Sequence, residues 1–231
     1  MAEIGQPGRR SSERGDVARR TIVETAERMY AERGLNGVSL REIGAAAGQL
    51  NTGAARYHFG SKLGLINAVF ELRMAPINAA RERMLDEIEA TGDVGEIRRL
   101  AAAFALPLAA ALGTRERPSW YLRFAVQAGH VDGSAPTRLA DQPWTRGVDR
   151  VRGLLLAAID VPAPLRALRW TTFAAHIGHA VADRERELHE PSRPGALPPD
   201  LFLSALLDTA VALVGAPVSP STDHLLSGVH A

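Results

Sequence analysis

The sequence predicts an all-α fold, and three observations lead to that expectation. Apolar residues recur at helical spacing along most of the 231-residue chain, no stretch alternates as a strand would, and caps and glycines divide the chain into helix-length segments. The 46% hydrophobic and 23% charged content is typical of a globular protein and excludes a wholly disordered or fibrous one. The chain has no cysteine, which excludes disulfides, zinc–thiolate sites and thiol nucleophiles.

The first expected helix follows a basic segment, residues 1–15, which is rich in Gly, Pro, Ser and Arg and which we expect to be a flexible arm. An apolar stripe at i, i+4, i+7 and i+8 then predicts a helix of about four turns. The stripe consists of Ile22, Ala26, Met29 and Tyr30. Gly34 and Gly37 bracket its C-terminal end.

Two short helices separated by a tight turn are expected next. Ser39 and Glu42 have the spacing of a capping box, which starts a helix that ends at Gly48. A third helix then runs to about His58, and Ser61 caps the helix that follows Gly60. Three helices with one sharp turn are the helix-turn-helix arrangement, whose third helix can lie in the major groove of DNA. We assign residues 16–62 to this DNA-binding domain.

The remaining helices form a second expected domain, residues 63–215, for ligand binding and dimerisation. We place them at 61–90 with an adjustment at Pro76, and at 93–112, 118–130, 135–160, 163–189 and 199–214. Asp93 and Glu96 resemble a helix start signal. Residues 216–231 lose periodicity and are expected to fray. The longest uncharged apolar run has 13 residues, too few for a membrane span, and no signal peptide is expected, so we expect a cytoplasmic protein without a membrane partner.

Two segments of the first domain resemble the TetR family of transcriptional repressors. They are VSLREIGAAAG, from Val38 to Gly48, and YHFGSK, from Tyr57 to Lys62, and the resemblance covers roughly residues 17–77. The turn between them is one residue longer than the commonest family pattern, which limits any base-by-base assignment. The resemblance implies a homodimeric, ligand-released repressor that acts on a pseudo-palindromic operator and is not an enzyme.

The resemblance implies that Tyr57 and Lys62 reach DNA phosphates, with His58 either beside them or packed under the turn. Ser39 and Arg41 lie near the start of the helix that crosses the DNA backbone. For contacts to base edges we expect Asn51, Thr52 and Arg56, with Gln49 as a weaker candidate. Asn51 is equally well explained as a helix cap, and Arg56 alternatively only solvates its helix. Residues 1–62 carry ten basic and seven acidic side chains, net +3, against 17 and 19, net −2, in residues 63–231.

A mostly apolar cavity with a few polar groups is the expected ligand site, and its ligand would be apolar or amphipathic. Plain core packing is the alternative for each of its residues. The expected lining is Phe104, Trp120, Phe124, Gln127, Trp144, Trp170, Phe173 and His176. His176, His179 and Asp183 fall on one helical face, but the pattern is weak and favours a polar stripe over a metal site. We therefore expect no metal and no cofactor.

The last two long helices are the expected dimer surface, as two such helices from each chain would make a four-helix interface. The expected contacts are Ala174, Ile177, Gly178, Val181, Phe202, Leu206, Ala210 and Leu213. Two other readings stay open at this point. One is an apolar-ligand-binding protein or small metal-dependent enzyme with a helix-turn-helix head. The other is a DNA-binding adaptor without an effector.

Overall fold

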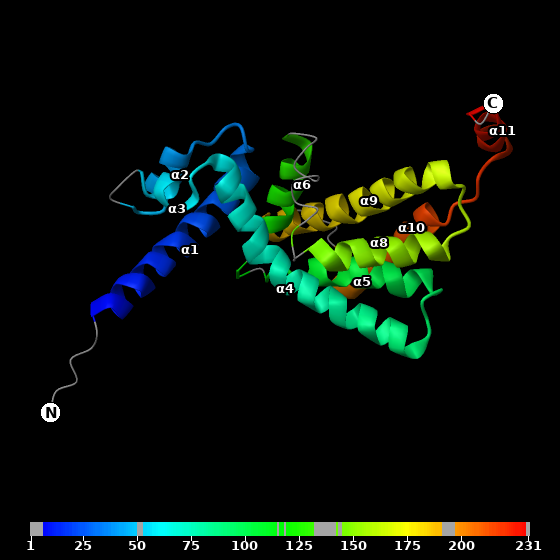
Figure 1. The fold of residues 1–231 in the computed structure, drawn as a ribbon, viewed down its shortest axis with the longest axis horizontal. Coiled ribbons are helices and arrows are strands. Elements are labelled where there is room, and N and C mark those ends of the chain that lie inside the picture. Colours follow the sequence, from blue (N-terminus) through cyan, green and yellow to red (C-terminus); the bar gives the residue numbers. More distant parts are fainter. Residues whose placement is uncertain are drawn as a thin grey trace.

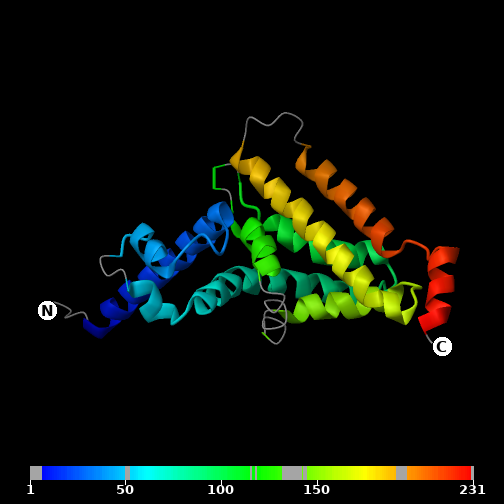
Figure 2. The same ribbon diagram turned by 90° about the horizontal axis from the view of Figure 1, so that it is seen from above.

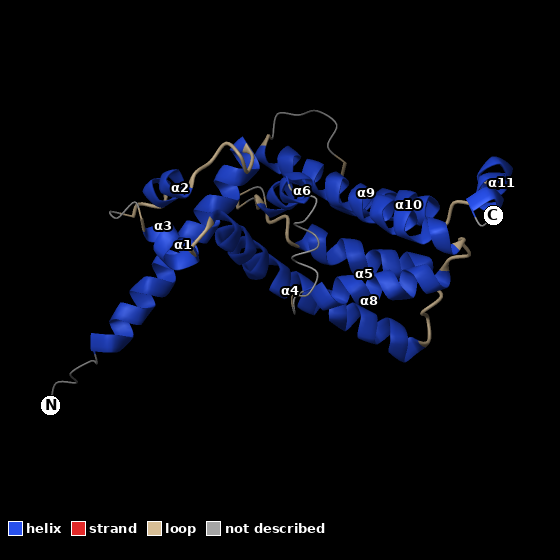
Figure 3. Ribbon diagram, turned by 45° about the horizontal axis from the view of Figure 1, so that its top comes forward, coloured by secondary structure: helices blue, strands red, loops and turns tan. Residues whose placement is uncertain are grey.

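The computed structural model describes residues 7–49, 53–114, 116–117, 119–131, 142, 145–190 and 197–229. Within these ranges every regular element is an α-helix, as the sequence predicts (Figures 1 and 3). None of the helices in this part of the chain is both long and apolar enough to cross a membrane.

Three helices at the N-terminal end form the head of the molecule. They are α1 (Pro7–Arg33), α2 (Leu40–Ala46) and α3 (Ala54–Phe59). Ile22, Tyr30, Ile43 and Ala55 are fully buried where they meet. The expectation of a flexible arm over residues 1–15 is wrong from Pro7 onward, where the backbone is already helical. Proline is favoured at a first helical position, and arginine and glutamate are good helix formers, so local propensity extends α1 beyond the apolar stripe.

Helix α4 (Lys62–Thr91) connects the head to the rest of the molecule, which we call the body. The Ser61 hydroxyl accepts the Gly64 N–H at 3.1 Å and so caps its start. The helix continues through Pro76 and ends at Gly92, whose left-handed backbone (φ 74°) is the conformation that glycine adopts without strain. Figure 2 shows α4 running from beneath the head into the body as one element.

The body contains α5 (Ile97–Ala110), α6 (Tyr121–Val131), α8 (Arg146–Ala158), α9 (Ala163–His189) and α10 (Pro199–Val214). Helix α5 packs between α4, α8 and α10, while α9 packs against α6 and α10. Figure 2 shows α9 and α10 side by side. The predicted bounds of α9 and α10 are confirmed. Prolines mark both starts: Pro162 is the N-cap of α9 and Pro164 its second residue, while Pro199 is the first residue of α10.

Two expectations for the body are wrong. Helix α5 begins at Ile97 and not at Asp93, because Asp93 and Glu96 form a turn in which the Glu96 N–H donates to the Asp93 carbonyl at 3.0 Å. The expected frayed tail contains α11 (Pro220–Val229). Ser219 starts this helix by accepting the Thr222 N–H at 3.3 Å, with Pro220 at the first helical position.

Candidate nucleic-acid interface and ligand groove

The second helix of the head is fixed by the predicted capping box. The Ser39 hydroxyl accepts the Glu42 N–H at 3.2 Å, and the Glu42 carboxylate accepts the Ser39 N–H at 2.9 Å. The same carboxylate receives the Ser39 hydroxyl at 2.7 Å and Arg33 at 2.9 Å. The hydrogen bonds from Ser39 and then Arg33 lower the pKa of Glu42 to about 2. The Ser39 hydroxyl is therefore engaged within the head, so its expected role in DNA binding stays a prediction.

The third helix of the head, α3, buries an alanine and exposes polar side chains to solvent. Ala55 is fully buried, whereas Arg56 is exposed and Tyr57 is 85% exposed. A tyrosine ring this exposed gains little from packing, so its phenol is available to a partner. Arg41 on α2 is also exposed, so the structure leaves all three side chains accessible on the head.

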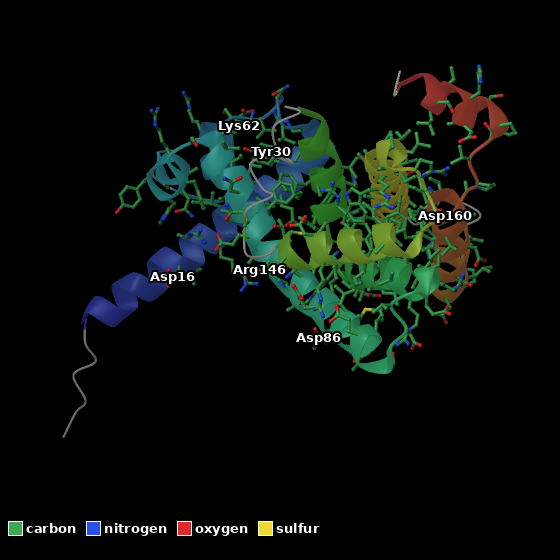
Figure 4. All side chains as sticks on the ribbon, turned by 45° about the vertical axis from the view of Figure 1, so that its right-hand side comes forward. Asp16, Tyr30, Lys62, Asp86, Arg146 and Asp160 are labelled. Atoms are coloured by element: carbon green, nitrogen blue, oxygen red, sulfur yellow. The ribbon has the colours of Figure 1, made fainter. Side chains whose placement is uncertain are left out.

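The other expected DNA-binding residues are arranged differently. His58 is half-buried with its ring edge-on to Tyr57, and Gln49 folds back so that its Nε2 donates to the Ala47 carbonyl at 3.2 Å. Lys62 begins α4 with its ammonium 5.8 Å from the centre of the Tyr30 ring, and Figure 4 shows the two residues close together. Asn51 and Thr52 lie outside the described residues.

The expected ligand-pocket residues do not form one site. Phe104, Phe124 and Phe173 are buried core residues, which matches the alternative of plain packing. Among the polar members, the Gln127 amide donates to the Ala31 carbonyl at 3.0 Å, and His176 Nε2 hydrogen-bonds to Thr209 Oγ1 at 2.8 Å. Trp120 stacks on His189, with the two ring centres 3.6 Å apart. Trp144 lies outside the described residues.

A largely apolar groove of about 470 Å³ lies between α6 and α9, and of the expected pocket residues that the structure describes, Trp170 alone lines it. The rest of the lining comes from α4, α5, α6 and α9: Met74, Leu108, Tyr121, Leu122, Ala125, Val126, Gly129, Thr171, Ala174, Ala175, Gly178 and His179. Small residues on both sides, Ala125 and Gly129 facing Ala174 and Gly178, leave the space unfilled. The sequence shows which residues share one face of a helix, but not which helix lies opposite that face. The groove could therefore not be predicted from the sequence.

Half of the expected dimer contacts are wrong. Ile177, Val181, Leu206 and Ala210 are buried inside the chain, because their stripes are the faces with which α9 and α10 pack on the body and on each other. Ala174 and Gly178 line the groove, and Phe202 and Leu213 are half-buried. The large apolar side chains that α9 and α10 leave exposed are Leu168 and Leu201, at 63% and 53%.

A buried ion pair joins the head to α4. The Glu27 carboxylate on α1 accepts Arg73 Nε at 2.6 Å and Nη2 at 3.1 Å, and its side chain is 2% exposed. Burial raises the pKa of Glu27, and the hydrogen bond and charge of Arg73 oppose that rise. The ion pair thus joins α1 to α4 at the point where α4 leaves the head.

Helix α6 is held at its first turn by α9 and along its length by α1. The fully buried Glu185 of α9 accepts the N–H groups of Leu122 and Arg123 at 3.1 and 2.9 Å. Burial raises the pKa of Glu185 to about 7, although these hydrogen bonds oppose the rise. Gln127 and Arg123 Nη2, the latter at 3.3 Å, both donate to the Ala31 carbonyl near the end of α1. These two hydrogen bonds connect α6 directly to the head.

The histidine stripe on α9 gives no support to a metal site. His179 Nδ1 hydrogen-bonds to the Ala175 carbonyl at 2.8 Å, and His176 faces Thr209 on α10. No group of three or more His, Cys, Asp or Glu side chains suited to a metal ion occurs in the described part of the chain.

Comparison with known proteins assigns the head to a family. Residues 22–69, from within α1 into α4, match the model for bacterial regulatory proteins of the tetR family. No curated protein matches the sequence significantly. A solved structure with a similar arrangement is RolR in complex with resorcinol, with 18% identity over 90% of this chain and 98% of that one and a TM-score of 0.45.

Proposed function

We propose that this chain is a transcriptional regulator of the TetR family, because residues 22–69 match that family's model, and that it is a ligand-released repressor that binds its operator as a homodimer. The observation that carries the DNA-binding part is the head itself, where α3 turns Arg56 and the 85% exposed Tyr57 outward from a rigid core. We propose no catalytic activity, metal or cofactor for the chain.

The positions of these side chains support a division of labour on the head. Tyr57, Lys62 and Arg41 position the head by binding phosphates: Tyr57 is exposed on α3, Lys62 begins α4 and Arg41 is exposed on α2. Arg56 contacts a base edge, for which guanine is the best partner of an arginine fork. His58, Gln49, Asn51 and Thr52 add contacts around the turn. One helix of six residues is too short to select a site alone, so two heads are needed.

The homodimer forms through the outer faces of α9 and α10. Leu168 and Leu201 supply exposed apolar area there, together with the exposed parts of Phe202 and Leu213. Two-fold symmetry then places the two heads on half-sites roughly 34–36 Å apart, which makes the operator a pseudo-palindrome.

Release from the operator begins in the groove between α6 and α9. A ligand that fits the groove better when α6 has shifted favours that conformer, and α6 pulls on the end of α1 through the Ala31 carbonyl. Coupling of about 1–3 kcal/mol lowers operator affinity roughly 5- to 150-fold.

Fluorescence anisotropy tests the proposal on DNA from upstream of the gene, with a scrambled duplex as control. We expect a Kd of about 10⁻⁸ M or lower and at least about 10³-fold selectivity at near-physiological salt. Tyr57→Ala and Lys62→Ala should weaken binding to both duplexes and flatten the salt dependence, whereas Arg56→Ala should chiefly reduce selectivity. Arg152→Ala, an exposed arginine on α8, is the matched control. Absence of binding to either duplex at low salt would refute the DNA-binding function.

A further inference from the structure

Among the residues that the structure describes, the body contains a buried arginine whose charge has no acidic partner. Arg81 on α4 is fully buried, and its Nε and Nη1 have no hydrogen-bond acceptor in this part of the chain. Its Nη2 reaches the Phe104 carbonyl at a long 3.4 Å, and its guanidinium lies 5.2 Å from the centre of the Phe104 ring. Burial lowers the pKa of Arg81 to about 10, so the group remains a cation at neutral pH.

No carboxylate within the described ranges forms an ion pair with this cation. Glu82 is the acidic group that influences Arg81 from a distance, and it is itself paired with Arg150 on α8 at 2.8 Å. Asn78, one turn earlier on α4, uses its side-chain oxygen to accept the Gly147 N–H at 2.8 Å. Buried arginines in proteins are normally paired, because an unpaired buried charge is strongly destabilising. An unpaired one is therefore evidence for a ligand that supplies the missing anion.

Arg81 lies beside the groove between α6 and α9. Met74 on α4 and Leu108 on α5 both line the groove. Arg81 lies two turns from Met74 on the same face of α4, and Phe104, which contacts Arg81, lies one turn from Leu108. Tyr121 also lines the groove and interacts electrostatically with Arg81. The ring of Trp170, which forms part of the groove wall, packs edge-on against Phe104 at 5.4 Å. Two aromatic rings thus separate the guanidinium from the groove.

We propose that Arg81 binds the carboxylate of the effector, and that the effector is therefore a small aromatic carboxylic acid. The apolar body of the acid lies in the groove, where aromatic and aliphatic side chains surround it. Its carboxylate displaces the Phe104 ring from the guanidinium and accepts the N–H groups of Arg81 that have no acceptor. This inference rests on the proposed function, because it names the ligand class of the same groove.

Calorimetry and thermal unfolding test the inference with benzoate, phenylacetate and 3-phenylpropionate, each paired with its neutral amide, and with inorganic phosphate. At least one of the acids should bind the wild-type protein and raise its Tm, while its amide and phosphate should not. Arg81→Met should weaken binding of that acid by roughly 10- to 100-fold, the loss expected for a charge-assisted hydrogen bond. Arg81→Lys keeps the charge and should lose less. Arg83→Met, an exposed arginine on the same helix, is the control.

The unliganded protein gives a second, independent readout. If Arg81 is held for a ligand, Arg81→Met removes an unpaired buried charge and should raise the Tm of the unliganded protein. A lower Tm would show that Arg81 has a structural role and would overturn the inference. So would equal binding of acid and amide, binding of phosphate alone, or failure of all three acids to bind.

Operator binding distinguishes this failure from failure of the proposed function. Arg81→Met should bind DNA like the wild type but should no longer be released by the acid. If the wild type binds no DNA, the proposed function fails, and the calorimetry still reports whether Arg81 holds a carboxylate.

Discussion

Replacing Arg73 by methionine removes the cation that compensates the buried carboxylate of Glu27 while keeping a side chain of similar length. The two hydrogen bonds of this pair measure 2.6 and 3.1 Å. A hydrogen bond to a charged group contributes about 1.5–3 kcal/mol, and we take the low end for each because Arg73 is 36% exposed. The expected loss in the free energy of unfolding is about 3 kcal/mol, within the range known for breaking buried pairs.

The loss should depend on pH, because it arises from leaving Glu27 ionised and buried. The folded-state pKa of Glu27 is already raised, and removal of Arg73 raises it further. A carboxyl with a raised folded pKa contributes stability that is complete below its unfolded pKa and is lost as the pH rises through the folded pKa. The difference between wild type and Arg73→Met should therefore be smaller near pH 5 than near pH 8.

Urea unfolding at both pH values and at one fixed protein concentration measures this difference, since the proposed dimerisation would make stability concentration-dependent. Arg83→Met on the same helix should change stability by less than about 0.5 kcal/mol. A loss below about 1 kcal/mol, or an equal loss at both pH values, would refute the assignment of the pair as the joint between head and body.

Three further results are expected. The pKa of Glu185 is raised to about 7 in the folded protein. The free energy of unfolding should therefore fall by up to about 3 kcal/mol as the pH rises from the pKa of a glutamate in the unfolded chain through 7. Urea unfolding at a series of pH values measures this fall, and Glu185→Gln should reduce it. In urea unfolding, Ser39→Ala should cost about 1 kcal/mol through loss of the cap, and Ser39→Thr, which keeps the hydroxyl that Glu42 accepts, should restore most of it. Gly147→Ala should lower the Tm by several degrees, because the added Cβ would lie 2.5 Å from Asn78 Oδ1 and push α8 away from α4; an unchanged Tm would mean that the two helices separate freely.

The sequence predicted those parts of the fold that depend on local signals. Prolines in the first turn or at the N-cap marked the starts of α9 and α10, and Ser39 with Glu42 formed the capping box, because each of these effects involves neighbours in the chain. The same reasoning placed Arg56 and Tyr57 on the third helix of the head.

The parts that depend on which helices meet were not predictable in this way. The apolar stripe of α9 shows that the helix has an inner face, but it does not say whether another helix of the same chain or of a partner covers that face. Ile177 and Val181 were consequently assigned to the wrong partner. Nothing in the sequence distinguishes Arg81 from Arg83 on the same helix, because only the packing of α5 and α8 buries the first and leaves the second exposed.

The unbroken course of α4 from head to body has a mechanical consequence. Thirty residues at 1.5 Å per residue make a rod of about 45 Å. A rotation of about 5° at the body end moves the far end by about 4 Å, slightly more than the rise of one base pair, about 3.4 Å. In the proposed dimer, a displacement of this size in each of the two heads would be enough to mismatch them with their half-sites. The proposed effector would then need to do no more than tilt one helix by a few degrees, and neither domain would have to unfold for the protein to leave its DNA.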